Sequence, residues 1–406
     1  MKMNCLVAQS GGPTAAINAS LAGVIKGVQD SDKYNKIYGS IHGIQGVLRN
    51  QTIDLTDKDQ NFIDNLIKTP AMYLGSCRFK LPDMADNKDI YEEIFSFFNT
   101  MNICAFFYIG GNDSMDTVAK LSKYATSIGS HILIAGVPKT IDNDLIETDH
   151  TPGFGSAAKY IATSIREIAY DTYIYDVESV TIIEVMGRDA GWLTAASALA
   201  RTNFSKAPHL IYLPEVAFDK EQFISDLQSL LPTTRNIIVA VSEGIRDKDG
   251  NYLSATEAAA DKFGHAQLSG TGKCLENLVK ERLGVKVRSV EVNVLQRCAG
   301  HMTSKTDLDE SFNLGYSAVK FTEEGHSAFM SSIVRTSDSP YICEIKYTPV
   351  ADVANKAKEV PRQWINQEGN DVTEDMITYL SPLVKGEVNI NYEDGITSYL
   401  DISHLI

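Results

Sequence analysis

The sequence repeats one local pattern, in which a short apolar run ends in a glycine-containing or polar turn and a helical pattern follows. The apolar runs are Asn4–Ala8, Cys104–Ile109, His131–Ala135, Ser179–Glu184 and Ile237–Val241. Parallel strands that are buried on both faces have this composition, and each needs a crossover before the next strand. The repetition therefore predicts an α/β protein with a mostly parallel sheet and helices on both of its faces.

The turns after these strands carry the polar residues that a shared binding site requires. In a parallel sheet, the loops at the carboxyl ends of the strands border the binding crevice. We therefore expect the chemistry to lie in five turns, which are Ser10–Thr14, Gly110–Ser114, Pro138–Asp144, Met186–Asp189 and Glu243–Gly244.

The charge of the chain limits its partners. The formal net charge of the 406 residues is −15 at pH 7, and such a field repels nucleic acid and anionic membranes. We expect neither partner, and an anionic substrate can bind only where basic side chains and backbone N–H groups gather. The absence of a long apolar run, of a signal-peptide pattern and of paired cysteines predicts a cytoplasmic protein with reduced thiols.

Two glycine turns are candidates for holding a phosphate. Gly11 and Gly12 lie between a strand and a helix, where the backbone can approach a phosphate and the helix offers unpaired N–H groups. The turn Gly110–Ser114 adds a carboxylate, which suits Mg²⁺ because this ion prefers few protein oxygens together with phosphate oxygens. The alternatives are a sterically tight turn in the first case and a helix N-cap at Asp113 or Ser114 in the second.

The stretch Pro138–Asp144 carries the densest chemistry, with Asp142 and Asp144 directly after a buried strand. Two carboxylates this close are unfavourable unless they bind a metal, a hydroxyl or a cation. Asp142 could act as a general base and Lys139 as a phosphate ligand. A solvated loop of the same composition is the alternative.

Several arginines follow or flank predicted strands. Arg188 follows one of them and could hold a phosphate through two parallel hydrogen bonds, while Glu243 offers an acceptor for sugar hydroxyls. Arg288 and Arg297 flank an apolar run, and Arg78 follows a glycine turn. For each single arginine, a surface charge is the alternative.

Taken together, these residues resemble the 6-phosphofructokinases. The landmarks SGGPTAAIN, GGNDS, PKTIDNDL, TPGFGSA, EVMGRDAGW, SEG and VNVLQR occur in the order typical of that family, over roughly residues 4–320. The resemblance implies two αβα (Rossmann-like) lobes with the active site in the cleft between them. Residues 1–150, completed by part of 296–340, are then expected to bind the phosphoryl donor, and residues 151–295 fructose 6-phosphate. Residues 340–406 are expected to form an appended segment packing on the core.

The resemblance also implies roles for single residues. Asp142 is expected to take the proton of the 1-hydroxyl of fructose 6-phosphate, and Arg188 to stabilise the transferred phosphoryl group. The residues expected at the sugar phosphate are Thr140, Ile141, Asp144, Met186, Gly187, Glu243, Arg288 and Arg297. Those expected at the donor are Gly11, Gly12, Arg78, Gly111, Asn112 and Ser114, and those expected near Mg²⁺ are Asn112, Asp113 and Asp144.

Asp113 and Lys139 indicate which donor is used, since members that use ATP commonly have glycine at both positions. Asp113 would repel the α-phosphate of a nucleotide, whereas the ammonium of Lys139 can hold a pyrophosphate oxygen. The pair resembles the pyrophosphate-dependent members, which implies reversible transfer from pyrophosphate to fructose 6-phosphate, giving fructose 1,6-bisphosphate and phosphate, in a homo-oligomer (dimer or tetramer). An ATP-dependent enzyme and a non-catalytic regulatory subunit remain alternatives, although intact Asp142 and Arg188 argue against the latter.

Three positions depart from the family pattern. Asn112 stands where many members have an aspartate associated with Mg²⁺, and Val294 where many have a histidine that contacts the sugar phosphate. Ser179 stands where many have an arginine that reaches into the active site of a neighbouring subunit. These departures leave open which carboxylate binds the metal and whether the site is completed across subunits.

Overall fold

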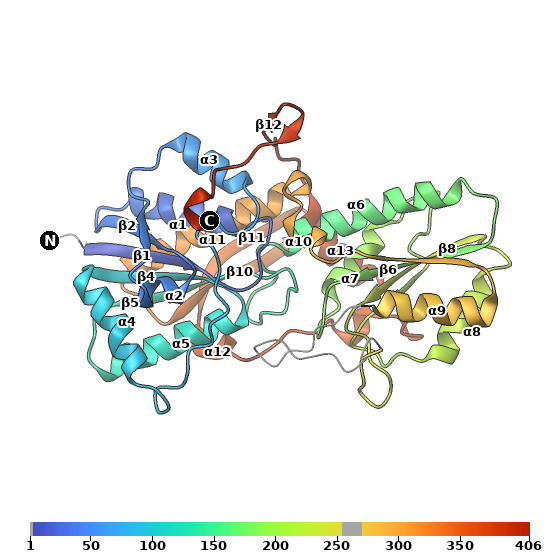
Figure 1. Ribbon diagram of the computed structural model, residues 1–406, viewed down its shortest axis with the longest axis horizontal. Coiled ribbons are helices and arrows are strands. Elements are labelled where there is room, and N and C mark those ends of the chain that lie inside the picture. The colour runs from blue at the N-terminus through green and yellow to red at the C-terminus, as the bar shows by residue number, and fades with distance from the viewer. Residues whose placement is uncertain (1–2, 254–269) are drawn as a thin grey trace.

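The computed structural model describes residues 3–253 and 270–406 of the chain and forms two lobes, each built on its own sheet (Figure 1). Within these residues, the larger sheet has the strand order β11-β10-β5-β4-β1-β2-β3 and the smaller one the order β7-β8-β6-β9. The strands of the smaller sheet are all parallel. In the larger sheet, only the edge strands β3 and β11 pair antiparallel with their neighbours. The predicted α/β fold with two lobes is confirmed.

The larger sheet has a hydrophobic cluster on each face. Its strands are β1 (Met3–Gln9), β2 (Tyr34–Ser40), β3 (Thr52–Asp54), β4 (Ile103–Gly110), β5 (Leu133–Pro138), β10 (Phe329–Asp338) and β11 (Tyr341–Pro349). One face packs against α1 (Ile17–Gln29), α3 (Gln60–Lys68) and α11 (Lys305–Glu323). The other packs against α2 (Ile44–Leu48), α4 (Asp89–Thr100), α5 (Asn112–Ser127) and α12 (Val350–Val353). The runs predicted as strands near residues 4–8 and 104–109 lie within β1 and β4, whereas the third begins at Leu133 rather than at His131.

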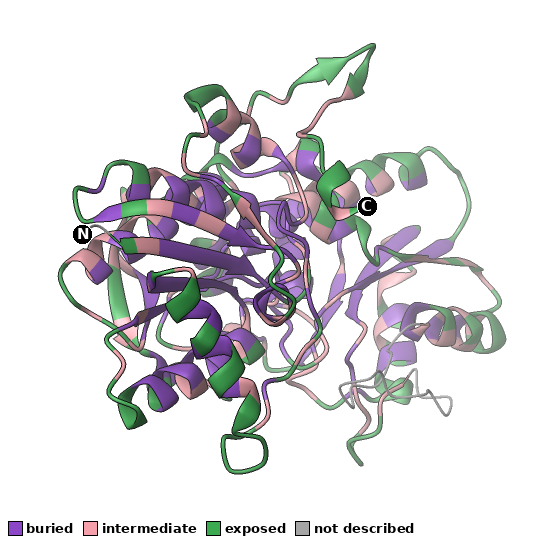
Figure 2. Ribbon diagram, turned by 60° about the vertical axis from the view of Figure 1, so that its left-hand side comes forward, coloured by how far each residue is buried: buried purple, intermediate pink, exposed green. Residues whose placement is uncertain are grey.

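The smaller sheet is covered in the same way. Its strands are β6 (Ser179–Val185), β7 (Leu210–Tyr212), β8 (Asn236–Ser242) and β9 (Lys286–Glu291). The helix α6 (Phe154–Tyr173) lies on one face with α7 (Trp192–Ala196), and α8 (Lys220–Leu230) and α9 (Thr271–Leu283) lie on the other. Alternate strand residues point to opposite faces, so both faces must be apolar to bury the sheet between helices. Figure 2 shows the result, with buried strands inside and exposed residues on the outer sides of the helices.

The C-terminal segment does more than pack on the core. Its β11 is an edge strand of the larger sheet, and the chain then crosses to the smaller lobe, where Val360, Ile365 and Met376 join the hydrophobic cluster around α6. It contains the short helices η3 (Arg362–Trp364), α13 (Glu374–Leu380) and η4 (Ser381–Val384). The hairpin of β12 (Tyr392–Glu393) and β13 (Ile396–Thr397) projects from the surface, and η5 (Ser403–Leu405) returns to the larger lobe (Figure 1).

The connection between the lobes contains the short helices α10 (Leu295–Cys298) and η2 (Gly300–Met302), and η1 (Ser197–Ala200) extends α7. Among the described residues, every helix is too short or too polar to cross a membrane.

Candidate active site

A cleft of about 580 Å³ is bordered by residues of both lobes, a size within the range of small-molecule sites. All five turns predicted from the sequence contribute to it. The lining residues that were predicted are Gly11, Gly12, Arg78, Gly111, Asn112, Asp113, Ser114, Lys139, Thr140, Asp142, Asp144, Met186, Arg188 and Glu243. The strand order explains the assembly, because β1, β4 and β5 are neighbours in the larger sheet and β6 and β8 are neighbours in the smaller one.

Lys139 lies at the floor of the cleft beside the first glycine turn. Its side chain is only 3% exposed, and Nζ donates a hydrogen bond of 2.6 Å to the carbonyl oxygen of Gly12. A Cβ on Gly11, whose φ is +83°, would lie 3.1 Å from the same Nζ, so glycine leaves room for the ammonium. Desolvation lowers the pKa of Lys139 to about 8, although the charges of Asp142 and Asp144 oppose this. The site therefore holds a buried cation that is still mostly charged at pH 7.

Asp142 and Asp144 form an acidic pair in the loop after β5. Both are partly buried, and desolvation raises the pKa of each, to about 7 for Asp144. The charge of Lys139 opposes the rise for Asp142, and the Asp142 N–H donates to Oγ1 of Thr140 at 3.1 Å. A carboxylate that is a stronger base than usual is suited to accept a proton near neutral pH.

The opposite wall comes from the loops after β6 and β8. The Gly187 N–H donates to Oε1 of Glu243 at 3.3 Å, and desolvation raises the pKa of Glu243 to about 7. Nε of Arg188 is buried and has no hydrogen-bond partner among the described residues. Such a group is unfavourable unless a ligand pairs with it, so Arg188 indicates a site for an anion.

The turn after β4 is attached to the C-terminal segment. Oδ1 of Asn112 accepts the N–H of Asn355 at 2.8 Å, and its Nδ2 donates to the carbonyl oxygen of Lys356 at 2.6 Å. Both ends of this amide are thus used in holding the chain. Asp113, the next residue, is exposed in the first turn of α5 and lines the cleft.

Four of the predicted substrate contacts are not among the residues that line the cleft, and they are Ile141, Gly187, Arg288 and Arg297. Arg288 points away from the cleft on β9, where Nη2 donates to Asp171 and to Thr172, both at 2.8 Å. The side chain of Ile141 packs in the hydrophobic cluster around α6, because its two polar neighbours occupy the cleft side of the loop. Arg297 lies next to the donor turn, with Nη1 3.5 Å from the Cβ that Gly12 would carry.

Other cleft residues were given no individual role from the sequence. They are Ser10, Cys77, Phe79, Lys80, Asp189, Ala190, Asn355, Lys356 and Ala357. Several of them are neighbours of predicted residues and follow from the turn positions. The last three belong to the C-terminal segment, and no local pattern marks residues whose role depends on contacts with a turn far away in the sequence.

The fold and the cleft together are those of a phosphotransferase. The chain belongs to the phosphofructokinase family, because the family model described as Phosphofructokinase matches residues 4–322. The family predicted from the sequence is thereby confirmed.

Named relatives match over nearly their whole length. The pyrophosphate–fructose 6-phosphate 1-phosphotransferase of Halomonas elongata is 41% identical over 396 residues, which cover 97% of this chain and 94% of that protein. The protein of the same name from Xanthomonas campestris is 41% identical over 405 residues, covering 99% and 96%. A crystal structure of a pyrophosphate-dependent phosphofructokinase from Nitrosospira multiformis superposes with a TM-score of 0.89 at 37% identity, covering 98% and 96%.

Proposed function

We propose that this chain is a pyrophosphate-dependent 6-phosphofructokinase, which transfers a phosphoryl group reversibly between pyrophosphate and the 1-hydroxyl of fructose 6-phosphate. The observation that carries the choice of donor is the buried ammonium of Lys139 on the carbonyl oxygen of Gly12, with Asp113 at the rim of the same wall. A short, highly charged donor can use this cation fully, whereas a nucleotide would bring its α-phosphate towards Asp113. The names of the relatives at about 40% identity support the same choice.

The residues of the cleft divide the reaction between them. Asp142 accepts the proton of the 1-hydroxyl of fructose 6-phosphate. The oxygen of that hydroxyl forms the new bond to phosphorus, and the bond from phosphorus to the leaving phosphate breaks. Arg188 pairs its unsatisfied N–H with the transferred group, and Glu243 accepts a hydroxyl of the sugar. Since little covalent chemistry is left to the protein, positioning and charge stabilisation supply most of the catalysis.

Mg²⁺ is proposed as the cofactor, and the donor set fits it. The cleft offers the carboxylates of Asp113 and Asp144, and hard cations prefer such oxygens together with phosphate oxygens and water. No group of three or more His, Cys, Asp or Glu side chains is arranged for a metal within residues 3–253 and 270–406, which suits an ion bound mainly through the substrate. Asn112 is a weaker candidate because its amide already holds the C-terminal segment. When bound, the ion would neutralise phosphate charge.

A homo-oligomer (dimer or tetramer) is part of this proposal. Arg288 borders a small groove with Ser179 and Lys286 on the outer surface of the smaller lobe. Exposed apolar side chains, including Ile174 at 74% exposure, lie at the same end of α6. The groove, the charge and the apolar surface favour a second copy of the chain at this face, where Arg288 would be buried. A cytoplasmic location is also proposed, and the six free cysteines are consistent with a reducing compartment.

A coupled assay tests the proposal. Purified protein is supplied with fructose 6-phosphate and Mg²⁺, and product formation is compared with pyrophosphate and with ATP as donor. We expect a kcat/KM for pyrophosphate at least tenfold above that for ATP, together with measurable formation of pyrophosphate from fructose 1,6-bisphosphate and phosphate. A preference for ATP would overturn the choice of donor, and activity with neither would favour the regulatory subunit.

A further inference from the structure

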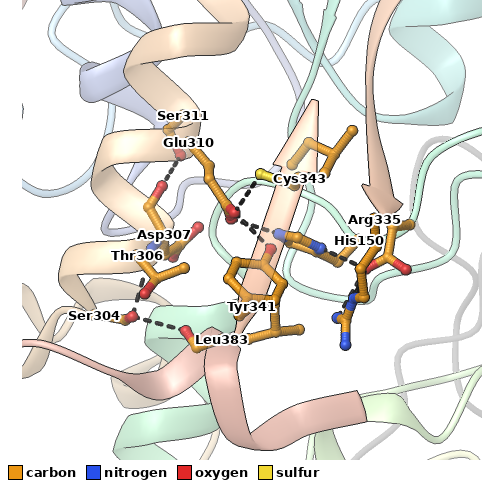
Figure 3. Close-up of polar contacts among 12 residues, drawn as sticks. His150, Ser304, Thr306, Asp307, Glu310, Ser311, Arg335, Tyr341, Cys343 and Leu383 are labelled. Atoms are coloured by element: carbon orange, nitrogen blue, oxygen red, sulfur yellow. Dashed lines mark hydrogen bonds and ion pairs between the residues drawn. The ribbon is translucent and has the colours of Figure 1, made fainter. Parts of the chain in front are cut away.

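Behind the acidic loop lies a buried network of charges that the reaction itself does not use (Figure 3). His150 is held between two carboxylates, with Nδ1 2.8 Å from Asp149 and Nε2 2.6 Å from Glu310. Arg335 donates to Asp149 at 2.9 and 3.1 Å, and the hydroxyl of Tyr341 donates to Glu310 at 2.5 Å. The network therefore joins α11 and the C-terminal strands to the chain that directly follows the acidic pair.

Lys358 connects this network to the acidic loop. Its Nζ donates to the carbonyl oxygen of Asp149 at 2.7 Å and to that of Thr148 at 3.2 Å, and Oδ1 of Asn143 lies 3.5 Å away. An ammonium has three N–H groups, and all three acceptors belong to this one loop. The backbone N–H of Lys358 also donates to the carbonyl oxygen of Asp144 at 2.7 Å. One residue thus fixes both ends of the segment 143–149.

The same residue contacts the helix that directly follows the opposite wall of the cleft. Its carbonyl oxygen accepts the indole N–H of Trp192 at 3.0 Å, and its Nζ lies 5.2 Å from the centre of a Trp192 ring. Trp192 begins α7, four residues after Arg188. Lys358 therefore links the loop that carries the proposed base to the turn that carries the proposed phosphoryl-binding arginine.

Tyr379 supplies a second link to the same loop. Its hydroxyl accepts a hydrogen bond from Nδ2 of Asn143 at 2.8 Å and donates one to the carbonyl oxygen of Asp149 at 2.7 Å. Asn143 lies between the two catalytic-loop aspartates and has a φ of +55°, which a residue other than glycine adopts rarely. The two C-terminal side chains thus hold both polar atoms of the residue that sets the direction of Asp142 and Asp144.

We propose that Lys358 is a positioning residue for phosphoryl transfer, which holds Asp142 in register with Arg188 by tying the loop 143–149 to Trp192. The proposal rests on the proposed function, because it assigns the base to Asp142. A misplacement of about 1 Å can reduce a rate by roughly 10²-fold. Removal of the ammonium should therefore act on kcat, while pyrophosphate and fructose 6-phosphate still find their charged contacts.

The test compares Lys358→Met, which keeps the length of the side chain, with two matched controls. Arg201→Met removes a 2.7 Å ion pair to Asp371 that also ties the C-terminal segment to the smaller lobe, but outside the cleft. Lys346→Met removes an exposed lysine of β11. Tyr379→Phe deletes only a hydroxyl and provides a second variant should Lys358→Met fail to fold. For each variant, kcat, both KM values and Tm are measured on the full chain with Mg²⁺, at a temperature well below every Tm.

We expect Lys358→Met to lower kcat at least tenfold with both KM values within threefold, and Tyr379→Phe to show the same split with a smaller loss. Arg201→Met should lower Tm with kcat within twofold, and Lys346→Met should change neither. The proposal is overturned if Lys358→Met keeps kcat within twofold of wild type. It is also overturned if the loss of kcat in Arg201→Met is as large as the loss in Lys358→Met. If Lys358→Met does not fold, an unchanged kcat in Tyr379→Phe overturns it. Wild type is assayed first with both donors, so a failure of the proposed function is seen separately. The ratios of kcat and KM between each variant and wild type are then measured with the donor that wild type uses.

Discussion

The two loops that border the cleft from the larger lobe are held in different ways. The loop after β5 is largely buried. Its carbonyl oxygen at Asp149 accepts hydrogen bonds from Lys358 and Tyr379, and its Asn143 side chain donates to the Tyr379 hydroxyl. The turn after β4 is attached to the C-terminal segment through the amide of Asn112, and the carboxylate of Asp113 is exposed at the rim. The difference teaches that the loop carrying the proposed base is fixed by several contacts from the C-terminal segment, whereas the exposed carboxylate of Asp113 can be replaced without breaking any of them.

The largest effect is expected for Asp142, the proposed base in the buried loop. Asp142→Asn should lower kcat by about 10²- to 10⁴-fold with little change in either KM, because a general base acts only in the chemical step. Steady-state kinetics with pyrophosphate and fructose 6-phosphate measure this. Asp54→Asn, an exposed carboxylate on β3, is the control and should keep wild-type kinetics. A near-normal kcat for Asp142→Asn would remove this residue from the role of base.

Arg288 and Arg297 provide the second comparison. The resemblance assigns both to the phosphate of fructose 6-phosphate, but in the structure they lie apart. Arg297→Ala should weaken fructose 6-phosphate binding by roughly 1.5–3 kcal/mol, since it loses a charge-assisted contact. Arg288 pairs with Asp171 away from the cleft of its own chain, so Arg288→Ala should weaken substrate binding only through a neighbouring copy. The KM values for both substrates are compared with those of Arg235→Ala, an exposed arginine beside Asp176.

Arg297 lies beside Gly12, so the competing outcome is a rise in the KM for pyrophosphate alone. That result would move Arg297 to the donor end of the site. For Arg288, the loss should be accompanied by a dependence of activity on protein concentration if a second copy buries it.

A smaller change is expected at the two positions proposed to select the donor, which are Asp113 in the turn after β4 and Lys139 in the loop after β5. Asp113→Gly should relax the exclusion of ATP, and Lys139→Gly should reduce the use of pyrophosphate, because an anion loses its cation in a partly desolvated site. The ratio of kcat/KM for ATP to that for pyrophosphate should rise several-fold in each variant and more in the double variant, because both residues border one volume. No change of the ratio in any of the three would show that other residues select the donor, while the family assignment would stand.

The last expected effect concerns stability and its pH dependence, not catalysis. The carboxylates of Glu310 and Asp149 raise the pKa of His150 to about 9 against the desolvation that lowers it, whereas an unfolded histidine titrates near 6.5. The native state thus holds a proton that the unfolded state has lost between these values. This stabilisation is complete below about pH 6.5 and is lost as the pH rises through 9. Each unit by which the folded pKa exceeds the unfolded one contributes about 1.4 kcal/mol to the free energy of unfolding.

We therefore expect the Tm of the wild type to fall between pH 6.5 and 9.5, and to fall less in His150→Gln, which lacks the titrating group. Thermal unfolding over this pH range measures both curves. Parallel curves for the two proteins would show that His150 carries no proton-linked stability.

The sequence patterns located the strands and the turns more reliably than they located individual side chains. The runs near β1, β4, β6 and β8 were predicted to within one or two residues, because buried parallel strands need continuous apolar runs. The side chain of Arg288 could not be placed from the sequence. Its direction depends on how β9 pairs in the sheet and on Asp171, which lies in α6. Lys358 left no local pattern at all, because its acceptors are more than 200 residues away in the chain.

The interleaving of the two lobes has a consequence for synthesis on the ribosome. The smaller sheet is made from one continuous stretch, from Ser179 to Glu291, but the larger sheet needs β10 and β11, and α1 packs along α11. Domains generally fold as units as they leave the ribosome, usually the N-terminal one first. Here we expect the sheet of the second lobe to pair while the first lobe still waits for its last helix and strands, and the cluster around α6 to be completed later by Val360, Ile365 and Met376. Limited proteolysis of ribosome-bound chains that end shortly after Met302 would contradict this if the first lobe were already protected.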